Sequence, residues 1–400
     1  MHDFIKLRDV VEKTPGSRNP TKAPDDSFIY VDVAAVDNSE KAIVGARRIL
    51  GADAPSRARK LIKAGDILVS TVRPNLNAVA LVPAEMDEQV ASTGFCVLRA
   101  TAKVLPEYLF YFARSKKFID GLSTLVGGAM YPAVSDSQVL DQALPLPPLP
   151  EQHRIVDILS RAEGIVRLRR EAQRKVAELI PGIFLDMFGD PAANPKGWPV
   201  RKISDFVAKF EGGKNIQAGS ENGSAYRILK VSAATSGVYR ESESKPAPDG
   251  YNPPASHIVR AGDMLFSRAN TVELVGATAI VERTDGKKLL PDKLWRFVWA
   301  ESVDPAYMHA LFQTPQVRRE LGKLSSGTSA SMRNISQAKL FGFPLPVAPY
   351  DKQKEFSEHA AAVRSIQSQQ SAATAKAEAA FAALLAQVFS GNATRQGLSA

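Results

Sequence analysis

The 400-residue sequence lacks several features that whole classes of protein require. It contains one cysteine, so no disulfide can form within the chain, and its five histidines are scattered without metal-ligand spacing. No run of 18 apolar residues is present, which argues against a membrane span. Residues 1–4 lack the basic and apolar regions of a signal peptide. We therefore expect a cytoplasmic protein that binds neither a metal ion nor a membrane.

The single cysteine, Cys96, lies in the strand-like run Phe95-Cys96-Val97-Leu98. A cysteine in such a run is far more often a small buried hydrophobic residue than a reactive thiol. We therefore predict that Cys96 is part of a core.

Composition and charge point to a soluble protein with a polyanionic partner. The chain is 44% hydrophobic and 23% charged, and it is long enough for two or three domains with separate cores. Its net charge is +9 and its pI is about 9.4. The basic residues are spread through both halves, which favours a folded, extended binding surface over a basic tail. The simplest polyanionic partner is a nucleic acid.

The sequence repeats itself after about 200 residues. Ala-Gly-Asp-Ile-Leu-Val-Ser-Thr at 64–71 returns as Ala-Gly-Asp-Met-Leu-Phe-Ser-Arg at 261–268. A proline cluster at 144–150 returns at 343–349, and Gln152 or Gln353 follows before a long helix-forming stretch. This period is too long for a solenoid, whose repeats have about 20–50 residues, so the sequence predicts a duplicated domain.

Each half has the pattern of a mixed α/β domain of about 145 residues. The Ala-Gly-Asp motifs predict tight turns that lead into strands, and Pro106 and Pro305 stand where helices should begin. Loops are expected at 14–27 and 211–224. The expected strands are Phe28–Val33, Ile67–Val72, Tyr226–Val231 and Met264–Phe266.

A heptad pattern follows each proline cluster. The first predicted seam is 155, 158, 162, 165, 169, 172, 176, 179 and 183, and the second, richer in alanine, is 356, 359, 363, 366, 370, 373, 377, 380, 384 and 387. Two such seams favour an antiparallel coiled coil. The alternative is that each helix packs on its own globular domain. Pro181-Gly182 is expected to end the first seam, and residues 190–195 form a stiff linker.

We expect the chain to divide into two pseudo-symmetric modules separated by two helical regions. A helix of about 30–35 residues spans roughly 45–52 Å, more than one turn of B-DNA, which is about 34–36 Å. The predicted segments are a first module at 1–147, a helical region at 148–189, a second module at 190–346, a second helical region at 347–391 and a flexible tail at 392–400.

No catalytic residue can be assigned. Asn252-Pro253-Pro254 matches the core of a motif that binds a flipped adenine, but Ala255 follows where an aromatic residue is needed. Residues 212–215 lack the spacing of a phosphate-binding loop. Asp285-Gly286-Lys287 resembles part of a nuclease metal site, but no well-placed acidic partner precedes it, so we interpret it as a hairpin turn before residues 288–290.

Residues suited to DNA contact cluster at matching places in the two halves. Polar and basic residues follow each Ala-Gly-Asp turn, and a second polar loop precedes each proline cluster. Arginine can contact guanine, asparagine can contact adenine, and other basic residues can position phosphates. The alternative for each is an ordinary solvated loop. The candidates are Arg57, Arg59, Lys60, Thr71, Arg73, Asn75, Asn77, Tyr131, Ser267, Arg268, Asn270, Thr328, Arg333 and Asn334.

These motifs together resemble the specificity subunit of Type I restriction–modification systems, over essentially the whole chain. The most specific motif is Pro-Leu-Pro-Pro-Leu-Pro-Glu-Gln at 145–152, which leads into a helix. Residues 184–191 and 381–391 close the two helices in the manner of that family. The second proline cluster departs from the family pattern at 347–353.

The resemblance implies two target-recognition domains that each read half of a bipartite, asymmetric site in double-stranded DNA, with the helices setting the spacer. It also implies two modification (methyltransferase) subunits and restriction subunits as partners. S-adenosylmethionine, ATP and magnesium are then expected on those partners, and the chain is expected to bind no cofactor. The alternatives are a non-catalytic coiled-coil scaffold and a bifunctional DNA methyltransferase or nuclease that uses Asn252 or Asp285.

Overall fold

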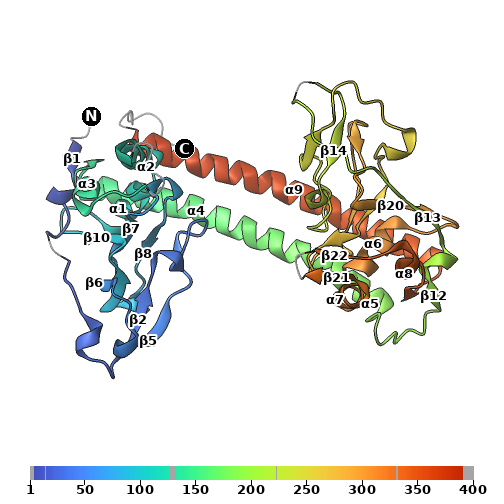
Figure 1. Cartoon of the computed structure of the whole chain (residues 1–400). Helices are drawn as coiled ribbons and strands as arrows, with labels where there is room; N and C mark the ends of the chain where they lie inside the picture. The colour runs from blue at the N-terminus through green and yellow to red at the C-terminus, as the bar shows by residue number, and fades with distance from the viewer. Residues whose placement is uncertain (1–3, 14, 127–131, 222, 330–331, 391–400) are drawn as a thin grey trace. The chain divides into compact units, whose positions relative to one another are not determined.

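A computed structural model describes residues 4–13, 15–126, 132–221, 223–329 and 332–390. The chain forms two compact units (Figure 1). Unit 1 comprises residues 1–170 and 372–400, and unit 2 comprises residues 171–371. The predicted tail at 392–400 lies outside the described residues.

Unit 1 contains mostly antiparallel sheets with short helices, as predicted for a mixed α/β module, and β2 and β9 are its one parallel pair among the described strands. Its core sheet has the order β10-β7-β8, a second sheet has the order β5-β2-β9-β6, and β1 pairs with β11. The strands are β1 (Phe4–Lys6), β2 (Ser27–Val31), β3 (Val36–Asp37), β4 (Ala42–Ile43), β5 (Arg47–Leu50), β6 (Ala58–Ile62), β7 (Ile67–Ser70), β8 (Val79–Leu81), β9 (Gln89–Ser92), β10 (Phe95–Leu98) and β11 (Ala143–Pro145). The short helices are α1 (Pro106–Ala113), α2 (Lys116–Ser123) and α3 (Asp136–Leu140).

Unit 2 repeats this plan. The order β20-β16-β18 matches β10-β7-β8, with β13 added at the edge, and β12 pairs with β23 as β1 pairs with β11. The strands are β12 (Val200–Lys202), β13 (Val207–Gly212), β14 (Arg227–Leu229), β15 (Ser244–Pro246), β16 (Met264–Ser267), β17 (Ala269–Asn270), β18 (Thr278–Ile280), β19 (Lys288–Leu289), β20 (Leu294–Trp299), β21 (Ser326–Ser329), β22 (Met332–Asn334) and β23 (Pro344–Pro346). The helices are α5 (Leu179–Phe188), α6 (Pro305–Gln313), α7 (Pro315–Leu324) and α8 (Gln337–Phe341).

The local predictions from the repeat are confirmed. Pro106 and Pro305 occupy the first position of α1 and α6, where proline's missing N–H has no role. The four predicted strands are present with bounds one or two residues different. Cys96 lies in β10 with 2% of its surface exposed, and burial raises the pKa of its thiol to about 12.

The repeated Ala-Gly-Asp motif closes the turn before the central strand of each unit. Gly65 and Gly262 adopt left-handed backbone conformations, with φ of 84° and 89°. In unit 1 the Asp66 carboxylate accepts a hydrogen bond from the backbone N–H of Lys63 and pairs with Arg99 at 2.7 Å. Asp263 makes the matching contacts in unit 2, with Arg260 and, at 2.9 Å, with Arg296. The motif is therefore structural.

The repeated glutamine joins three segments in each unit. Gln152 is fully buried, its Oε1 accepts from the N–H of Leu105 at 2.9 Å, and its Nε2 donates to the carbonyl of Pro147 at 2.9 Å. In unit 2, Gln353 accepts from the N–H of Asp304 at 3.0 Å and donates to the carbonyl of Ala348 at 2.7 Å. Each amide thus ties a long helix to the proline cluster before it and to the start of α1 or α6.

The two long helices are α4 (Leu149–Ala177) and α9 (Tyr350–Phe389), and both begin close to the boundaries predicted at 148 and 347. Each helix contributes residues to both units. In unit 1, Ile155 and Leu159 of α4 share a core with Leu385 of α9. In unit 2, Phe356 of α9 packs with Phe184 of α5. The antiparallel pairing and the packing of each helix on a globular domain therefore both occur.

About half of the predicted seam positions are wrong. At every second position the residue on the buried side of the helix is the next one along the chain. Ile165 of the first predicted seam is 54% exposed and Ile366 of the second is 43% exposed. The buried positions of α9 instead include Gln353, Ala360 and Thr374. The prediction followed the branched aliphatic residues, whereas the buried seam admits polar side chains that find partners.

Those partners are visible where α4 and α9 meet. In unit 1 the Arg170 guanidinium contacts the Glu378 carboxylate at 2.7 Å. In unit 2, Gln173 donates to the Ser371 hydroxyl at 2.9 Å and Gln367 donates to the Val176 carbonyl at 3.4 Å. Hydrogen bonds offset the loss of water, so these polar residues are tolerated in the seam.

The first helical region breaks before the position predicted from Pro181-Gly182. α4 ends at Ala177 and α5 begins at Leu179 and includes both Pro181 and Gly182. Proline lacks an N–H and its ring clashes with the carbonyl four residues earlier, which is that of Ala177. The interruption therefore falls one turn before the proline, and the helix resumes because Gly182 donates to the carbonyl of Glu178.

The apolar composition of α9 is relevant to the prediction that the chain has no membrane span. By length and composition alone, α9 is apolar enough over 18 residues to cross a membrane. One such helix is weak evidence, because alanine-rich core helices pass the same test. In α9 the seam residues Phe356 and Leu385 belong to the cores of the two units.

We expect Gln353→Ala to destabilise unit 2 by roughly 2–4 kcal/mol, because it leaves a buried N–H and a buried carbonyl without partners. Urea unfolding followed by tryptophan fluorescence would measure the loss. Gln369→Ala, at an exposed position of the same helix, is the matched control. Equal stability of the two variants would contradict the structural role of the buried amide.

Candidate nucleic-acid interface

The two polar segments predicted in unit 1 lie side by side. The N–H of Arg73 donates to the carbonyl of Pro132 at 2.7 Å, and the N–H of Val134 donates to the carbonyl of Thr71 at 2.9 Å. Val72 and Ala133 form an isolated antiparallel bridge. The segment after the Ala-Gly-Asp strand is therefore bonded to the segment before α3.

We call this pair of bonded segments a junction. The junction of unit 2 is a three-stranded sheet with the order β17-β22-β21. Ala269 pairs with Asn334 and Asn270 pairs with Arg333. The second polar loop that the sequence predicted in this half is wrong for residues 326–329 and 332–334, which are strands. The edge of β17 supplies backbone partners, so the polar side chains do not prevent strand pairing.

Two predicted arginines are held by the framework of unit 2. Arg268 donates from Nε to the carbonyl of Asp292 at 2.8 Å, and its guanidinium lies 5.5 Å from the centre of the Trp295 ring. Arg333 donates to the carbonyls of Ser325 at 2.7 Å and Gly327 at 3.1 Å. These contacts fix both guanidinium planes, and Arg268 uses only its Nε in them, so its other donors can face a base or a phosphate. Sequence analysis missed Trp295 and Asp292, because a supporting residue carries no motif.

Two other predicted residues are buried behind the junctions. Thr71 is 7% exposed, and its hydroxyl donates to the carbonyl of Gly94 at 2.9 Å. Ser267 is fully buried, and its hydroxyl has no hydrogen-bond partner among the residues that the structure describes. Neither side chain reaches the surface in this conformation.

The other predicted residues of the first junction lie nearer the surface. Arg73 and Asn75 are exposed, and Asn77 is half-buried. Arg73 and Asn77 both have φ of 50°, a left-handed conformation that asparagine tolerates better than most residues. The Asn77 amide donates to the carbonyl of Arg114 at 3.3 Å.

The basic run of unit 1 is divided between surface and framework. Arg57 is exposed, whereas Arg59 donates to the carbonyl of Ala58 and Lys60 pairs with Asp136 at 2.5 Å. Of these three residues, Arg57 is the one best placed for a phosphate.

The remaining candidates are in unit 2 or outside the described residues. Asn270 accepts a hydrogen bond from the N–H of Thr271, and Asn334 is half-buried in β22. Thr328 belongs to β21. Tyr131 lies outside the described residues.

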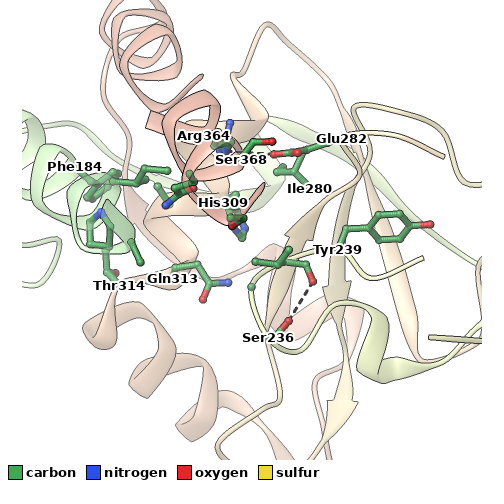
Figure 2. Close-up of a pocket in the computed structure, with 18 of the residues that line it drawn as sticks. Phe184, Ser236, Tyr239, Ile280, Glu282, His309, Gln313, Thr314, Arg364 and Ser368 are labelled. Carbon is green, nitrogen blue, oxygen red and sulfur yellow. Dashed lines mark hydrogen bonds and ion pairs between the residues drawn. The ribbon is translucent and has the colours of Figure 1, made fainter. Parts of the chain in front are cut away.

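Unit 2 also contains a cavity of about 800 Å³ between α5, α6 and α9 (Figure 2). His309 lies on its floor, and its Nδ1 is 2.8 Å from the Thr278 hydroxyl. Burial, together with the nearby Arg364 charge, lowers the pKa of His309 to about 4. The imidazole is therefore neutral near pH 7, and Gln313 beside it also binds Thr278. The floor therefore offers neutral hydrogen-bonding groups, while charged side chains such as Glu282 and Arg364 line the cavity around it.

Of the two residues considered for catalysis, Asn252 is exposed and Asp285 makes a structural contact. Asp285 pairs with Lys288 at 2.6 Å. The predicted hairpin at 285–287 is wrong, because β18 and β19 on either side belong to different sheets and β19 pairs in parallel with β14. Within the described part of the chain, no group of three or more histidine, cysteine, aspartate or glutamate side chains is arranged to hold a metal ion.

Comparisons with known proteins agree with this architecture. Residues 2–178 match the family model of the Type I restriction modification DNA specificity domain. The chain is similar to the specificity subunit of the Type I restriction enzyme EcoEI from Escherichia coli, with 28% identity over 50% of this chain. It is also similar to the EcoKI specificity subunit from Escherichia coli strain K12, with 23% identity over 76% of this chain and 69% of that subunit.

The structural likeness extends over nearly the whole chain. A chain solved in work on the assembly and conformational transition of the type I R-M system superimposes with a TM-score of 0.65, at 28% identity and with 98% of each chain covered. The match to the EcoEI subunit spans only 34% of that protein's length. Residues 2–178 thus match the specificity domain of Type I restriction–modification systems, and the chain as a whole is similar to their specificity subunits in sequence and in fold.

Proposed function

We propose that this chain recognises a bipartite, asymmetric sequence in double-stranded DNA, with one half read by each unit. The observation that carries the proposal is the pair of equivalent junctions, at residues 71–73 with 132–134 and at residues 268–270 with 333–335. In both, a segment that leaves the central strand is bonded to the segment before a short helix. Two surfaces built on one framework can bind two sites on one polymer.

The side chains on this shared framework differ, which supports different half-sites. Thr71-Val72-Arg73 in unit 1 corresponds to Arg268-Ala269-Asn270 in unit 2. Because donors and acceptors at these positions read base edges, a changed set reads a changed sequence. The net charge of +9 supports attraction to the DNA backbone in addition.

We further propose that the chain is non-catalytic and directs other subunits to its site. The side chains support this role: Asp285 is paired with Lys288, and the Asn252-Pro253-Pro254 tripeptide is followed by Ala255 instead of an aromatic residue. S-adenosylmethionine, ATP and magnesium would then be bound by modification and restriction subunits. We also propose a cytoplasmic location, which the proposed DNA partner and the free, buried Cys96 support.

Two copies of one partner subunit fit the duplicated helices. Counting from the buried glutamines Gln152 and Gln353, Ile165 and Ile366 occupy the same position, since 165 − 152 = 366 − 353 = 13. These isoleucines are 54% and 43% exposed, respectively. Equivalent exposed apolar residues on both helices are expected where the same protein surface docks twice. A protein that served only as a scaffold would also use these isoleucines to bind its partners. Such a role would, however, leave the two junctions without a ligand.

We expect the exchange of residues 1–147 for those of a relative with another specificity to change one half of the methylated sequence. The physical reason is that unit 2 retains its own junction. Long-read mapping of methylated adenines in host DNA would measure the outcome. A change in both halves, or in neither, would exclude one unit per half-site.

We expect Arg268→Ala and Arg57→Ala to weaken DNA binding in different ways. Arg268→Ala should cost about 1–3 kcal/mol on the cognate site and relax specificity at one base pair. Arg57→Ala should weaken binding to all sequences evenly and reduce the salt dependence by about one phosphate contact. Competition with single-base variants at several salt concentrations separates the two effects. Arg268→Ala binding like the parent would remove Arg268 from the interface.

We expect Ile165→Lys and Ile366→Lys each to release one modification subunit, because a charge at a buried apolar contact is strongly unfavourable. Native mass spectrometry of the assembled complex would count the subunits. Ala361→Lys, at an exposed position of α9, is the matched control. Thr374→Val would not serve, because Thr374 is buried within the helix seam. Retention of both subunits in both isoleucine variants would place the partners elsewhere.

A further inference from the structure

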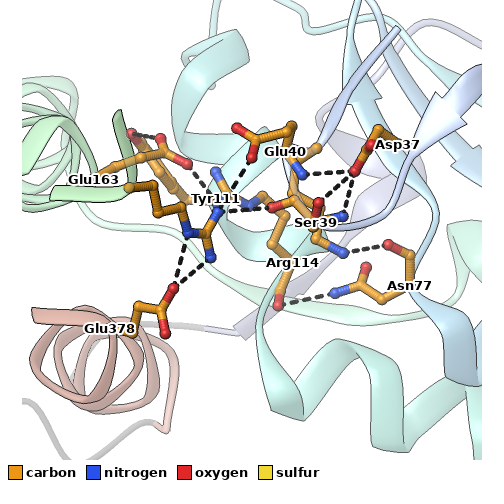
Figure 3. Close-up of polar contacts among 10 residues, drawn as sticks. Asp37, Ser39, Glu40, Asn77, Tyr111, Arg114, Glu163 and Glu378 are labelled. Atoms are coloured by element: carbon orange, nitrogen blue, oxygen red, sulfur yellow. Dashed lines mark hydrogen bonds and ion pairs between the residues drawn. The ribbon is translucent and has the colours of Figure 1, made fainter. Parts of the chain in front are cut away.

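Unit 1 has its own cavity, of about 790 Å³, at the position equivalent to that in unit 2. It lies between the loop joining β3 to β4, the end of α1, and the helices α4 and α9 (Figure 3). Four cationic side chains line it: Lys41, Arg114, Arg167 and Arg170. Three carboxylates line it as well: Glu40, Glu163 and Glu378.

Arg170 forms ion pairs with two of the three carboxylates. Its Nη2 lies 2.7 Å from Glu378 Oε1, and its Nη1 lies 3.5 Å from Glu40 Oε1. The same guanidinium donates to the carbonyl of Ser39 at 3.4 Å. Glu40 and Glu378 are therefore committed to one arginine, which ties the β3–β4 loop to α9.

Arg114 takes the third carboxylate and keeps one nitrogen without a partner. Its Nη2 lies 2.6 Å from Glu163 Oε1, and Glu163 Oε2 accepts from the Tyr111 hydroxyl at 3.0 Å. The guanidinium lies over Phe110 and Phe381, at 4.7 and 5.4 Å from their ring centres. The side chain is only 8% exposed, and its Nη1 has no hydrogen-bond partner among the described residues. A buried guanidinium nitrogen without an acceptor is strongly unfavourable.

Lys41 brings a second cation close to Arg114. Its backbone is left-handed, with φ of 53°, and its amine donates to the carbonyl of Asn77 at 2.5 Å. Asn77 in turn donates from its amide to the carbonyl of Arg114 at 3.3 Å. Burial, and next the Arg114 charge, lower the pKa of Lys41 to about 8, against the opposing effect of Asp37. The amine is therefore a half-buried cation that is hydrogen-bonded to a neutral carbonyl.

The cavity is lined by four cationic side chains but only three carboxylates, so negative charge is in deficit. All three lining carboxylates are engaged by Arg170 or Arg114, while the Lys41 amine bonds only to a neutral carbonyl in the described structure. Arg167 is an exposed cation at the same rim. We propose that this cavity binds a small phosphate-bearing anion, held by Arg114 Nη1, Lys41 and Arg167. A phosphate has enough oxygens for three separate donors, and charge-assisted bonds to it are strong.

The equivalent cavity of unit 2 has lost this chemistry. Counting from Tyr108 and Tyr307, Gln313 stands where Arg114 stands in unit 1. Counting from Gln152 and Gln353, Arg364 replaces Glu163 and Ser368 replaces Arg167. The proposed anion site is therefore specific to unit 1, and it does not depend on the proposed DNA recognition.

Inorganic phosphate is the probe that tests the site in the full-length protein. We expect saturable binding by isothermal titration calorimetry at constant ionic strength, with a stoichiometry of one. Lys41→Asn removes the amine and keeps a residue that tolerates the left-handed backbone. This variant and Arg167→Gln should each weaken phosphate binding at least tenfold. Lys22→Asn, an exposed lysine of the same unit, should bind like the parent.

Two results would overturn the proposal. One is the absence of saturable phosphate binding up to millimolar concentrations. The other is binding that Lys41→Asn and Arg167→Gln leave unchanged, since the anion would then lie elsewhere. Weakened assembly with a modification subunit in these variants, without any phosphate binding, would overturn it in favour of an acidic side chain of that partner. Thermal melting of each variant verifies that the fold is intact.

Discussion

The architecture of each unit depends on one buried amide. Gln152 and Gln353 each accept a hydrogen bond from a backbone N–H at the start of α1 or α6. Each also donates one to a carbonyl in the proline cluster before its helix. A buried amide that lost these partners would be strongly unfavourable, so the helix can leave the domain in only one direction. The glutamine after each proline cluster is therefore the joint between a globular domain and its long helix. The nearby tyrosines reinforce the joint, because Tyr108 donates to the carbonyl of Pro145 at 2.8 Å.

The duplication retained these polar joints and changed the surfaces around them. The Asp66–Arg99 and Asp263–Arg296 pairs close the same turn in both units. By contrast, the equivalent cavities differ in charge, with Arg114 in one and Gln313 in the other. A buried ion pair or amide cannot change alone without loss of stability, whereas a cavity wall or a junction side chain can. Two units can therefore share one framework and still bind different ligands.

The candidate DNA residues fall into three physical groups. Thr71 and Ser267 are buried and support the junctions. Arg268 and Arg333 are held by backbone carbonyls, so their guanidinium groups are positioned before any ligand arrives. Such pre-organisation favours specific contacts, because less side-chain entropy is lost on binding. Arg57 and Asn75 are exposed. Which of them contact bases stays a prediction.

The sequence by itself determined the duplication, the strands at the Ala-Gly-Asp turns and the helices beginning at Pro106 and Pro305, because glycine, proline and alternating apolar residues act locally. Only the tertiary structure decided which face of α4 and α9 is buried. Ile165 looked like a core residue and is exposed, while Gln353 and Thr374 are buried. Burial of a polar group depends on partners that are distant in the sequence, such as the N–H of Asp304 for Gln353. For the same reason, Lys41, Arg114, Arg167 and Arg170 came together only when the β3–β4 loop, the end of α1 and α4 folded against one another.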